Sequence, residues 1–206
     1  MTISIYEMAL YAIGMAGLWA VPGPVWVALT ARAISGGFQA AWPLAVGVAL
    51  GDLIWPLAAV LGLTWIEAAY GDFLSILRWL AAVIFVAMGV LLIRKPVATM
   101  TAESRLTRPG MWAGLSVGLA AVIGNPKAIL FYMGALPGFF ALDRLNAIDI
   151  AAIVSISALV PMAGNLGLAL FLDRARGLLS SPSAVRRLNV TSGILLVGVG
   201  AVIPFL

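Results

Sequence analysis

The stretch Val21-Pro22-Gly23-Pro24 interrupts the first apolar segment of this chain, and the stretch Gly124-Asn125-Pro126-Lys127 interrupts the fourth. Pro24 and Pro126 lie 102 residues apart in a chain of 206, so each half carries one interruption. Proline breaks a helix because it has no backbone N–H and its ring clashes with the preceding turn. Backbone groups freed in hydrocarbon are costly unless they line a cavity or meet a ligand. Two broken apolar helices at corresponding places therefore predict the binding site of a secondary transporter.

Composition indicates an integral membrane protein. Hydrophobic residues make up 63% of the chain and charged residues 10%, and the mean hydropathy is +1.11. A soluble domain has about 25% charged residues. The isoelectric point near 10 does not indicate a nucleic-acid partner, because the basic residues lie in short loops between apolar segments and form no stripe on a polar face. The lipid bilayer is the predicted environment.

Cysteine and histidine are both absent from the sequence. The chain therefore has no thiol nucleophile, no imidazole base and no disulfide. A membrane enzyme would need a nucleophile or an acid/base cluster, and no two carboxylates are paired in the middle of an apolar segment. We expect no enzymatic activity, no bound metal and no cofactor.

Six apolar segments approach or exceed the length that crosses a bilayer, about 20 residues per helix. They cover residues 5–30, 38–66, 73–93, 111–139, 147–172 and 188–206. Residues 96–110 contain two prolines and mixed charges, and are interpreted as a linker between one repeat of about residues 1–95 and a second of about 111–206. Three spans per half is an odd number, so the second half would enter the membrane from the opposite face. The predicted fold is an all-α integral membrane protein, a single transporter domain over residues 1–206. Its six transmembrane helices form two inverted three-helix repeats with helices 1 and 4 broken.

Basic residues are sorted between alternate loops. Nine of the twelve follow the first, third or fifth apolar segment: Arg32, Arg94, Lys95, Arg105, Arg108, Arg174, Arg176, Arg186 and Arg187. Loops rich in Lys and Arg face the cytoplasm. The sequence therefore predicts a multi-pass protein of the cell (inner) membrane with both its N-terminus and its C-terminus outside.

Two charged residues fall inside apolar segments and are candidates for substrate binding or coupling. Asp52 lies in the second segment, where a carboxylate at mid-membrane costs about 2.5–3.5 kcal/mol on insertion scales and usually marks a pathway or proton site. A structural Asp hydrogen-bonded to a broken helix is the alternative. Lys127 follows the second break, where its ammonium could hold a substrate carboxylate, pair with Asp52, or extend to the membrane interface.

The residues of the two breaks complete the candidate site: Pro22, Gly23, Pro24, Asn125 and Pro126. Gly23 allows close backbone approach, and Pro24 has a φ suited to the first turn of the following half-helix. Asn125 can cap the half-helix that follows it.

A weaker break is predicted in the fifth segment at Pro161 and Asn165. Asp52 and Asn165 each lie four positions from a helix proline, Pro56 in the first case and Pro161 in the second. We therefore take Asn165 as the counterpart of Asp52 in the second half.

These motifs resemble those of the LysE-type translocators, the family of lysine exporters and homoserine/threonine-resistance proteins. The resemblance covers nearly the whole chain and is carried by Pro22-Gly23-Pro24, by Gly47 with Gly51-Asp52, and by Asn125-Pro126-Lys127-Ala128. It implies export of amino acids or related metabolites, driven by proton antiport. Family members often carry Asn or a small polar residue soon after Pro-Gly-Pro, where this chain has Val25-Trp26.

The expected function is an inner-membrane exporter of small zwitterionic solutes, amino acids or their derivatives, by alternating access coupled to protons. Two alternatives stay open. A cation or metal-ion flux transporter of the same superfamily would have to manage with one buried carboxylate, whereas Ca²⁺ takes 6–8 oxygen ligands. A non-transport structural membrane protein would not need a charged pair at two breaks. The solute, the coupling ion and assembly into a homo-oligomer are left open.

Overall fold

The computed structural model describes residues 1–69, 73–94 and 108–174, together with scattered positions between 186 and 205. All regular secondary structure in these ranges is helical, which agrees with an α-helical membrane protein. The elements are α1 (Ile5–Ala20), α2 (Pro24–Gly51), α3 (Ile54–Ala69), α4 (Phe73–Arg94), α5 (Met111–Ile123), α6 (Pro126–Leu130), the π-helical turn η1 (Phe131–Ala135), α7 (Leu136–Phe139), the 3₁₀ turn η2 (Leu142–Arg144) and α8 (Ala147–Arg174).

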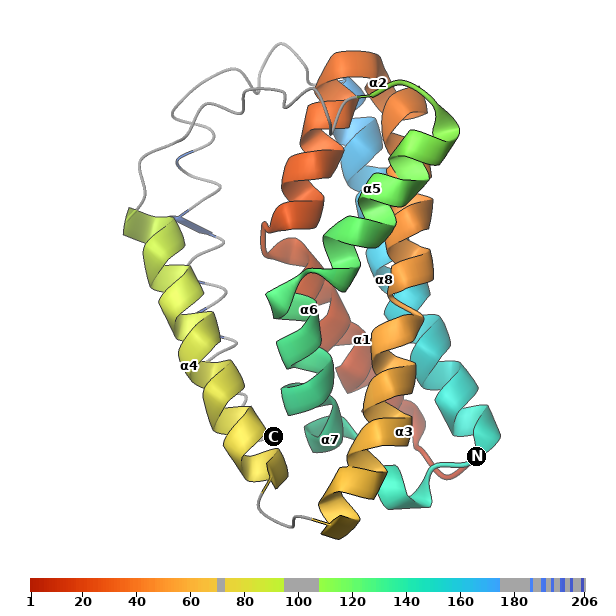
Figure 1. Ribbon diagram of the computed structural model, residues 1–206, viewed down its shortest axis with the longest axis vertical. Helices are drawn as coiled ribbons and strands as arrows, with labels where there is room; N and C mark the ends of the chain where they lie inside the picture. The colour runs from red at the N-terminus through yellow and green to blue at the C-terminus, as the bar shows by residue number, and fades with distance from the viewer. Residues whose placement is uncertain are drawn as a thin grey trace.

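The helices run along the long axis of the molecule (Figure 1). α1 and the first part of α2 lead from the end that holds the N-terminus, here called the N-terminal end, to the opposite end. There the chain reverses at Gly37, whose φ of 72° and ψ of −165° only glycine adopts readily. The opposite end is called the turn end after this reversal. The rest of α2 and α3 return from it, α4 runs back, α5 to α7 return again, and α8 runs to the turn end (Figure 1).

Two predicted segment boundaries differ from the structure. The first apolar segment was expected to end near residue 30, but the helix continues to the reversal at Gly37. The second segment was expected to be continuous, but it is interrupted at Asp52 and Leu53, between α2 and α3. Pro56 accounts for this interruption, because it has no N–H to donate to the carbonyl of Asp52. The predicted sixth segment falls largely outside the described residues.

Two helical stretches of the described chain are long and apolar enough to cross a membrane: Pro24–Gly62, which contains the reversal at Gly37 and the interruption at Asp52, and Ala147–Arg174. A third span results if the pair Met111–Ile123 and Pro126–Phe139, which meet at 47°, is one broken helix. The shorter apolar helix Ile5–Ala20 precedes the first break. The protein is therefore a multi-pass membrane protein.

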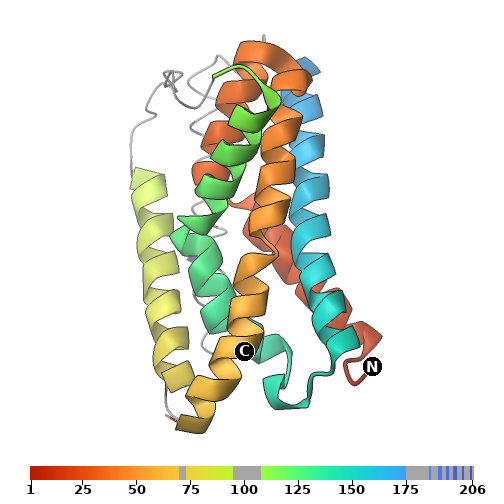
Figure 2. The same ribbon diagram turned by 45° about the vertical axis from the view of Figure 1, so that its right-hand side comes forward.

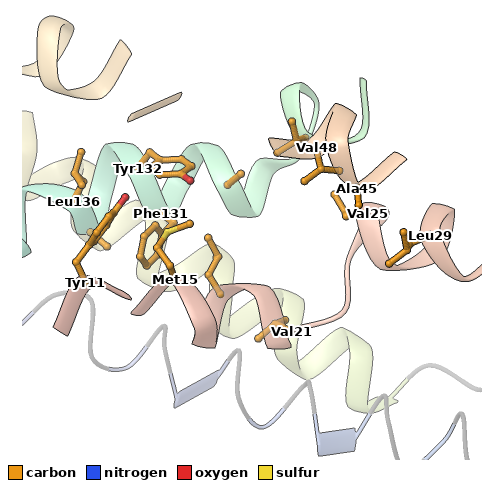
Figure 3. Packing of buried hydrophobic residues seen from close by; sticks show 14 of the residues in the cluster. Tyr11, Met15, Val21, Val25, Leu29, Ala45, Val48, Phe131, Tyr132 and Leu136 are labelled. Atoms are coloured by element: carbon orange, nitrogen blue, oxygen red, sulfur yellow. The ribbon is translucent and has the colours of Figure 1, made fainter. Parts of the chain in front are cut away.

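The core forms where α2 packs against α5 and α8, its two most extensive partners, and where α1 packs against α8. Close contact of α2 with α5 depends on glycine. A Cβ on Gly47 would meet the backbone of Leu115, and a Cβ on Gly118 would meet the backbone of Leu44. Toward the N-terminal end, aromatic rings fill the space between α1 and η1, with Tyr11 stacked 6.3 Å from Phe131, centroid to centroid (Figure 3).

α4 and α8 lie on opposite flanks of the molecule (Figure 2). The described side chains that α4 leaves exposed include large apolar ones, Ile76, Trp79, Leu80, Val83 and Leu91. Trp79 and Val83 line a hollow together with Ala201 and Phe205 of the C-terminal segment.

Polar side chains tie the helices together at each end. At the N-terminal end, the buried carboxylate of Asp149 accepts from the backbone N–H of Thr2 at 3.0 Å and from its hydroxyl at 2.6 Å. At the turn end, the buried guanidinium of Arg32 donates to the carbonyls of Ala40 at 2.6 Å, Arg108 at 3.0 Å and Gly110 at 3.3 Å. Arg32 thus holds the reversal of the chain against the start of α5.

Candidate functional site

The first predicted break lies between α1 and α2. Val21 at the end of α1 has an extended backbone (φ −81°, ψ 119°), and Gly23 is the extended N-cap of α2. Pro24 occupies the first turn of α2, as expected from its fixed φ. Between the two helices Pro22 and Gly23 form no helix, so carbonyl groups at the end of α1 have no partner within their own helix.

The second predicted break lies between α5 and α6. Asn125 is the N-cap of α6, and its side-chain oxygen accepts from the backbone N–H of Lys127 at 3.1 Å. Pro126 occupies the first turn that follows. The capping predicted for Asn125 is thus confirmed, and the break turns the chain by 47°.

Lys127 joins the two breaks directly. Its ammonium, with the side chain only 5% exposed, donates to the carbonyl of Leu18 at 2.7 Å and to that of Val21 at 2.6 Å. A lysine from the second break therefore satisfies the carbonyls that the first break leaves free. Within the described chain Lys127 forms no direct ion pair with Asp52. An ammonium has three N–H donors, so one remains beyond the two backbone bonds.

A cavity of about 40 Å³ lies beside this junction, enough for about three water molecules at ~10–15 Å³ each. Four predicted site residues line it: Asp52, Asn125, Lys127 and Asn165. Gly23 adjoins it, since a Cβ there would lie 3.8 Å from Nζ of Lys127. Pro22, Pro24 and Pro126 shape the breaks and are not among the cavity-lining residues. The remaining lining is Met15, Leu18, Trp19, Val25, Trp26, Val48, Val122, Ala128 and Pro161.

Asp52 lies where α2 ends. Its backbone N–H donates to the carbonyl of Val48 at 2.8 Å, which continues the helix by one bond. Its side chain is 4% exposed and makes no hydrogen bond to any residue that the structure describes. The carboxylate therefore lines the cavity without serving to cap a broken helix.

Asn165 lies in α8, fully buried, on the other side of the same cavity. Its side-chain oxygen accepts from the indole N–H of Trp19 at 3.0 Å, while its amide nitrogen has no partner in the described chain. The weaker break predicted at Pro161 is wrong, because α8 runs unbroken from Ala147 to Arg174 with Pro161 inside it. The loss of the one bond that Pro161 cannot make is tolerated there.

Two tryptophans form one wall of the cavity. The indole N–H of Trp26 donates to the carbonyl of Trp19 at 2.7 Å, so Trp26 bridges the first break, and the two rings lie 5.6 Å apart. A Cβ on Gly164 would collide with the Trp19 ring, so Gly164 leaves the space that this ring occupies. Trp55 donates to the carbonyl of Val122 at 3.3 Å, next to the second break.

A set of buried hydroxyls lies closer to the N-terminal end, and nothing in the local sequence marks it. Tyr11 and Ser157 are hydrogen-bonded at 2.7 Å, and the buried hydroxyl of Tyr132 has no described partner. Tyr132 belongs to the π-helical turn η1, and such turns are frequent at functional sites. The bonded pair joins positions 146 residues apart, which a single sequence does not reveal.

Apolar helices that break at two places around a shared polar cavity are typical of a membrane transport protein. The family model of the LysE type translocators matches residues 16–204. The chain belongs to this family, as the sequence motifs predict, and the family implies membrane transport of amino acids or related solutes. An uncharacterized membrane protein of Synechocystis sp. (strain PCC 6803) is 32% identical over 183 residues, which cover 89% of this chain and 88% of the relative. No solved structure matches the chain.

Proposed function

We propose that the protein exports small zwitterionic solutes, amino acids or their derivatives, across the inner membrane in exchange for protons. The observation that carries the proposal is the pairing of opposite charges on one cavity. Asp52 comes from the first half of the chain and Lys127 from the second, and both side chains line the space where the two breaks meet. A zwitterion presents an ammonium and a carboxylate, which complement these two groups.

Asp52 is the proposed site for the solute ammonium or for a proton. Its carboxylate has no hydrogen-bond partner in the described residues, so a bound cationic group would not have to displace one. Lys127 is the proposed site for the solute carboxylate, through the N–H that its bonds to Leu18 and Val21 leave over. Gly23 leaves the backbone of the first break open beside this ammonium.

Alternating access would be a movement of the two halves about the breaks, as in transporters built from inverted repeats. Support comes from the placement of one break in each half and from the bonds between them. We assign the repeats to about residues 1–95 and 111–206, with six spans and both termini outside.

The alternative of a cation flux transporter is disfavoured by the ammonium of Lys127. This positive charge lines the cavity and would repel a metal ion, for which the cavity offers Asp52 as its one carboxylate ligand.

Asp52→Asn tests the proposal. In proteoliposomes with an imposed pH gradient, we expect this variant to lose gradient-driven amino-acid transport, because the amide can neither release a proton nor offset an ammonium. The control is Asp143→Asn, the same substitution at an exposed side chain near the N-terminal end, which should transport normally. Normal gradient-driven transport by a folded Asp52→Asn protein would remove Asp52 from the mechanism.

A further inference from the structure

The cavity offers few charges to a solute. Its charged lining consists of Asp52 and Lys127, and its other polar side chains are those of Asn125, Asn165 and the two tryptophans. Asn125 is already engaged as the cap of α6. The rest of the lining is apolar and includes Met15, whose side chain is fully buried.

An α-amino acid is larger than the cavity of about 40 Å³, so it would bind in a more open state of the two halves. There its ammonium and carboxylate would use both charges of the lining. A charged side chain on the solute would add a third charge with no partner in the lining. Burying a charge without a partner is strongly unfavourable. An apolar solute side chain would instead replace water against apolar groups, which is favourable.

The free amide nitrogen of Asn165 adds a donor for the solute. An indole N–H can only donate, so the amide oxygen of Asn165 must face Trp19, as its 3.0 Å bond shows. The NH₂ group is thereby left over, buried and without a partner in the described chain. A buried donor of this kind favours a ligand that accepts a hydrogen bond.

We propose that the cavity takes α-amino acids with an uncharged, apolar side chain, that Asn165 donates to the solute carboxylate beside Lys127, and that Trp19 and Trp26 contact the solute side chain. The inference rests on the proposed function and narrows its solute class. It assigns a binding role to Asn165 and a selectivity role to the tryptophan wall.

Solute exchange without a pH gradient tests this selectivity. Proteoliposomes are loaded with unlabelled leucine, and entry of labelled leucine, methionine, lysine and glutamate is measured. We expect leucine and methionine to exchange at least about tenfold faster than lysine and glutamate, since each 1.4 kcal/mol of binding corresponds to a factor of ten. Lysine exchange equal to or faster than leucine exchange would overturn the inference and leave amino-acid transport standing. No exchange of any of the four by folded protein would overturn the proposed function as well.

Asn165→Asp tests the role of Asn165. The aspartate keeps an oxygen that accepts from Trp19, but it replaces the free NH₂ by an oxygen and adds a second carboxylate to the cavity beside Asp52. We expect leucine exchange to fall and the ratio of lysine to leucine exchange to rise about tenfold, the factor for 1.4 kcal/mol. An unchanged ratio would overturn the assignment of Asn165.

Asn146→Asp is the matched control for the added charge. Asn146 lies at the start of α8, where its side-chain oxygen accepts from Ile148 and Asp149, and the aspartate can keep these bonds. This variant should leave the ratio unchanged.

Trp26→Ala tests the selectivity role of the tryptophan wall. It should change the ranking of leucine and methionine exchange, whereas Trp112→Ala, at a position that is 75% exposed, should not. A ranking unchanged by Trp26→Ala would remove that residue from the solute wall.

Discussion

At the scale of single residues, Lys127 supplies hydrogen bonds that the first break removes. Pro22 has no backbone N–H to donate to the carbonyl of Leu18, four residues before it, and the extended backbone at Val21 and Gly23 takes the Val21 carbonyl out of the helical pattern. The ammonium of Lys127 supplies donors to two carbonyls at this place, Leu18 and Val21. The cost of the first break is therefore offset by a side chain from the second.

Lys127→Met should lower the thermal stability of the protein in detergent. The methionine fills a similar volume but leaves two buried carbonyls without donors, at about 1–3 kcal/mol for each group. Asn125→Ala provides the comparison, because it removes only a cap worth roughly 1 kcal/mol. Thermal unfolding of both purified variants measures the difference. A smaller loss for Lys127→Met than for Asn125→Ala would show that water satisfies the two carbonyls equally well.

The Tyr11–Ser157 bond gives a second prediction at this scale. The Ser157 hydroxyl has one hydrogen and also bonds the carbonyl of Ile153 at 2.8 Å, so Tyr11 is the donor in the 2.7 Å contact. Ser157→Ala should destabilise the protein by about 1–3 kcal/mol, because it strands the Tyr11 donor. The double variant Tyr11→Phe/Ser157→Ala should recover part of this loss. Additive losses measured by chemical unfolding would contradict a direct bond.

At the scale of elements, the approach of α2 to α5 depends on the absence of a side chain at Gly118. Gly118→Ala should destabilise the protein by about 1–3 kcal/mol, the usual cost of overpacking, since its Cβ would lie 2.9 Å from the backbone nitrogen of Val48. Gly17→Ala is the matched control in α1. Its Cβ would meet nothing within 4 Å, and alanine favours the helix by roughly 0.5–1 kcal/mol. Equal thermal shifts in the two variants would contradict this packing.

The elements also show why some breaks are predictable from sequence. Pro24 and Pro126 each follow a residue that can start a new helix, Gly23 and Asn125, so the chain stops one helix and begins another. Pro161 has no such neighbour and remains inside α8. The interruption at Asp52 lies four residues before Pro56, which leaves the Asp52 carbonyl without its helical donor. Pro161 leaves the Ser157 carbonyl in the same position without interrupting α8, so a proline alone does not tell which helix breaks.

At the scale of the whole molecule, exposed basic residues gather toward the turn end. Arg94 ends α4, Arg174 ends α8 and Arg108 lies next to the start of α5. Single introduced cysteines can test the orientation. The chain has no cysteine of its own, so only the introduced residue can be labelled. In intact cells an impermeant maleimide should label Asp143→Cys at the N-terminal end and leave Ser35→Cys at the turn end unlabelled. The reverse pattern would invert the proposed orientation.

What the sequence could not predict lies in contacts between distant segments. Arg32 was expected to be a loop charge, yet it is 1% exposed, because carbonyls from residues 40, 108 and 110 converge on it. The bond from Trp19 to Asn165 likewise spans 146 residues. Composition and proline positions predict helices and breaks, but they do not tell which side chain reaches which carbonyl across the molecule.

The anchoring of α1 has a consequence for biosynthesis. Its start is held by Asp149 and its end by Lys127, so neither anchor exists when the helix leaves the ribosome. At ~5–20 residues per second, the 147 residues that separate Thr2 from Asp149 take on the order of ten seconds to translate. During that interval the nascent first helix must find other partners for its terminal polar groups, in the insertion machinery or at the lipid headgroups. Its contact with Asp149 therefore forms only after residue 149 has been synthesised.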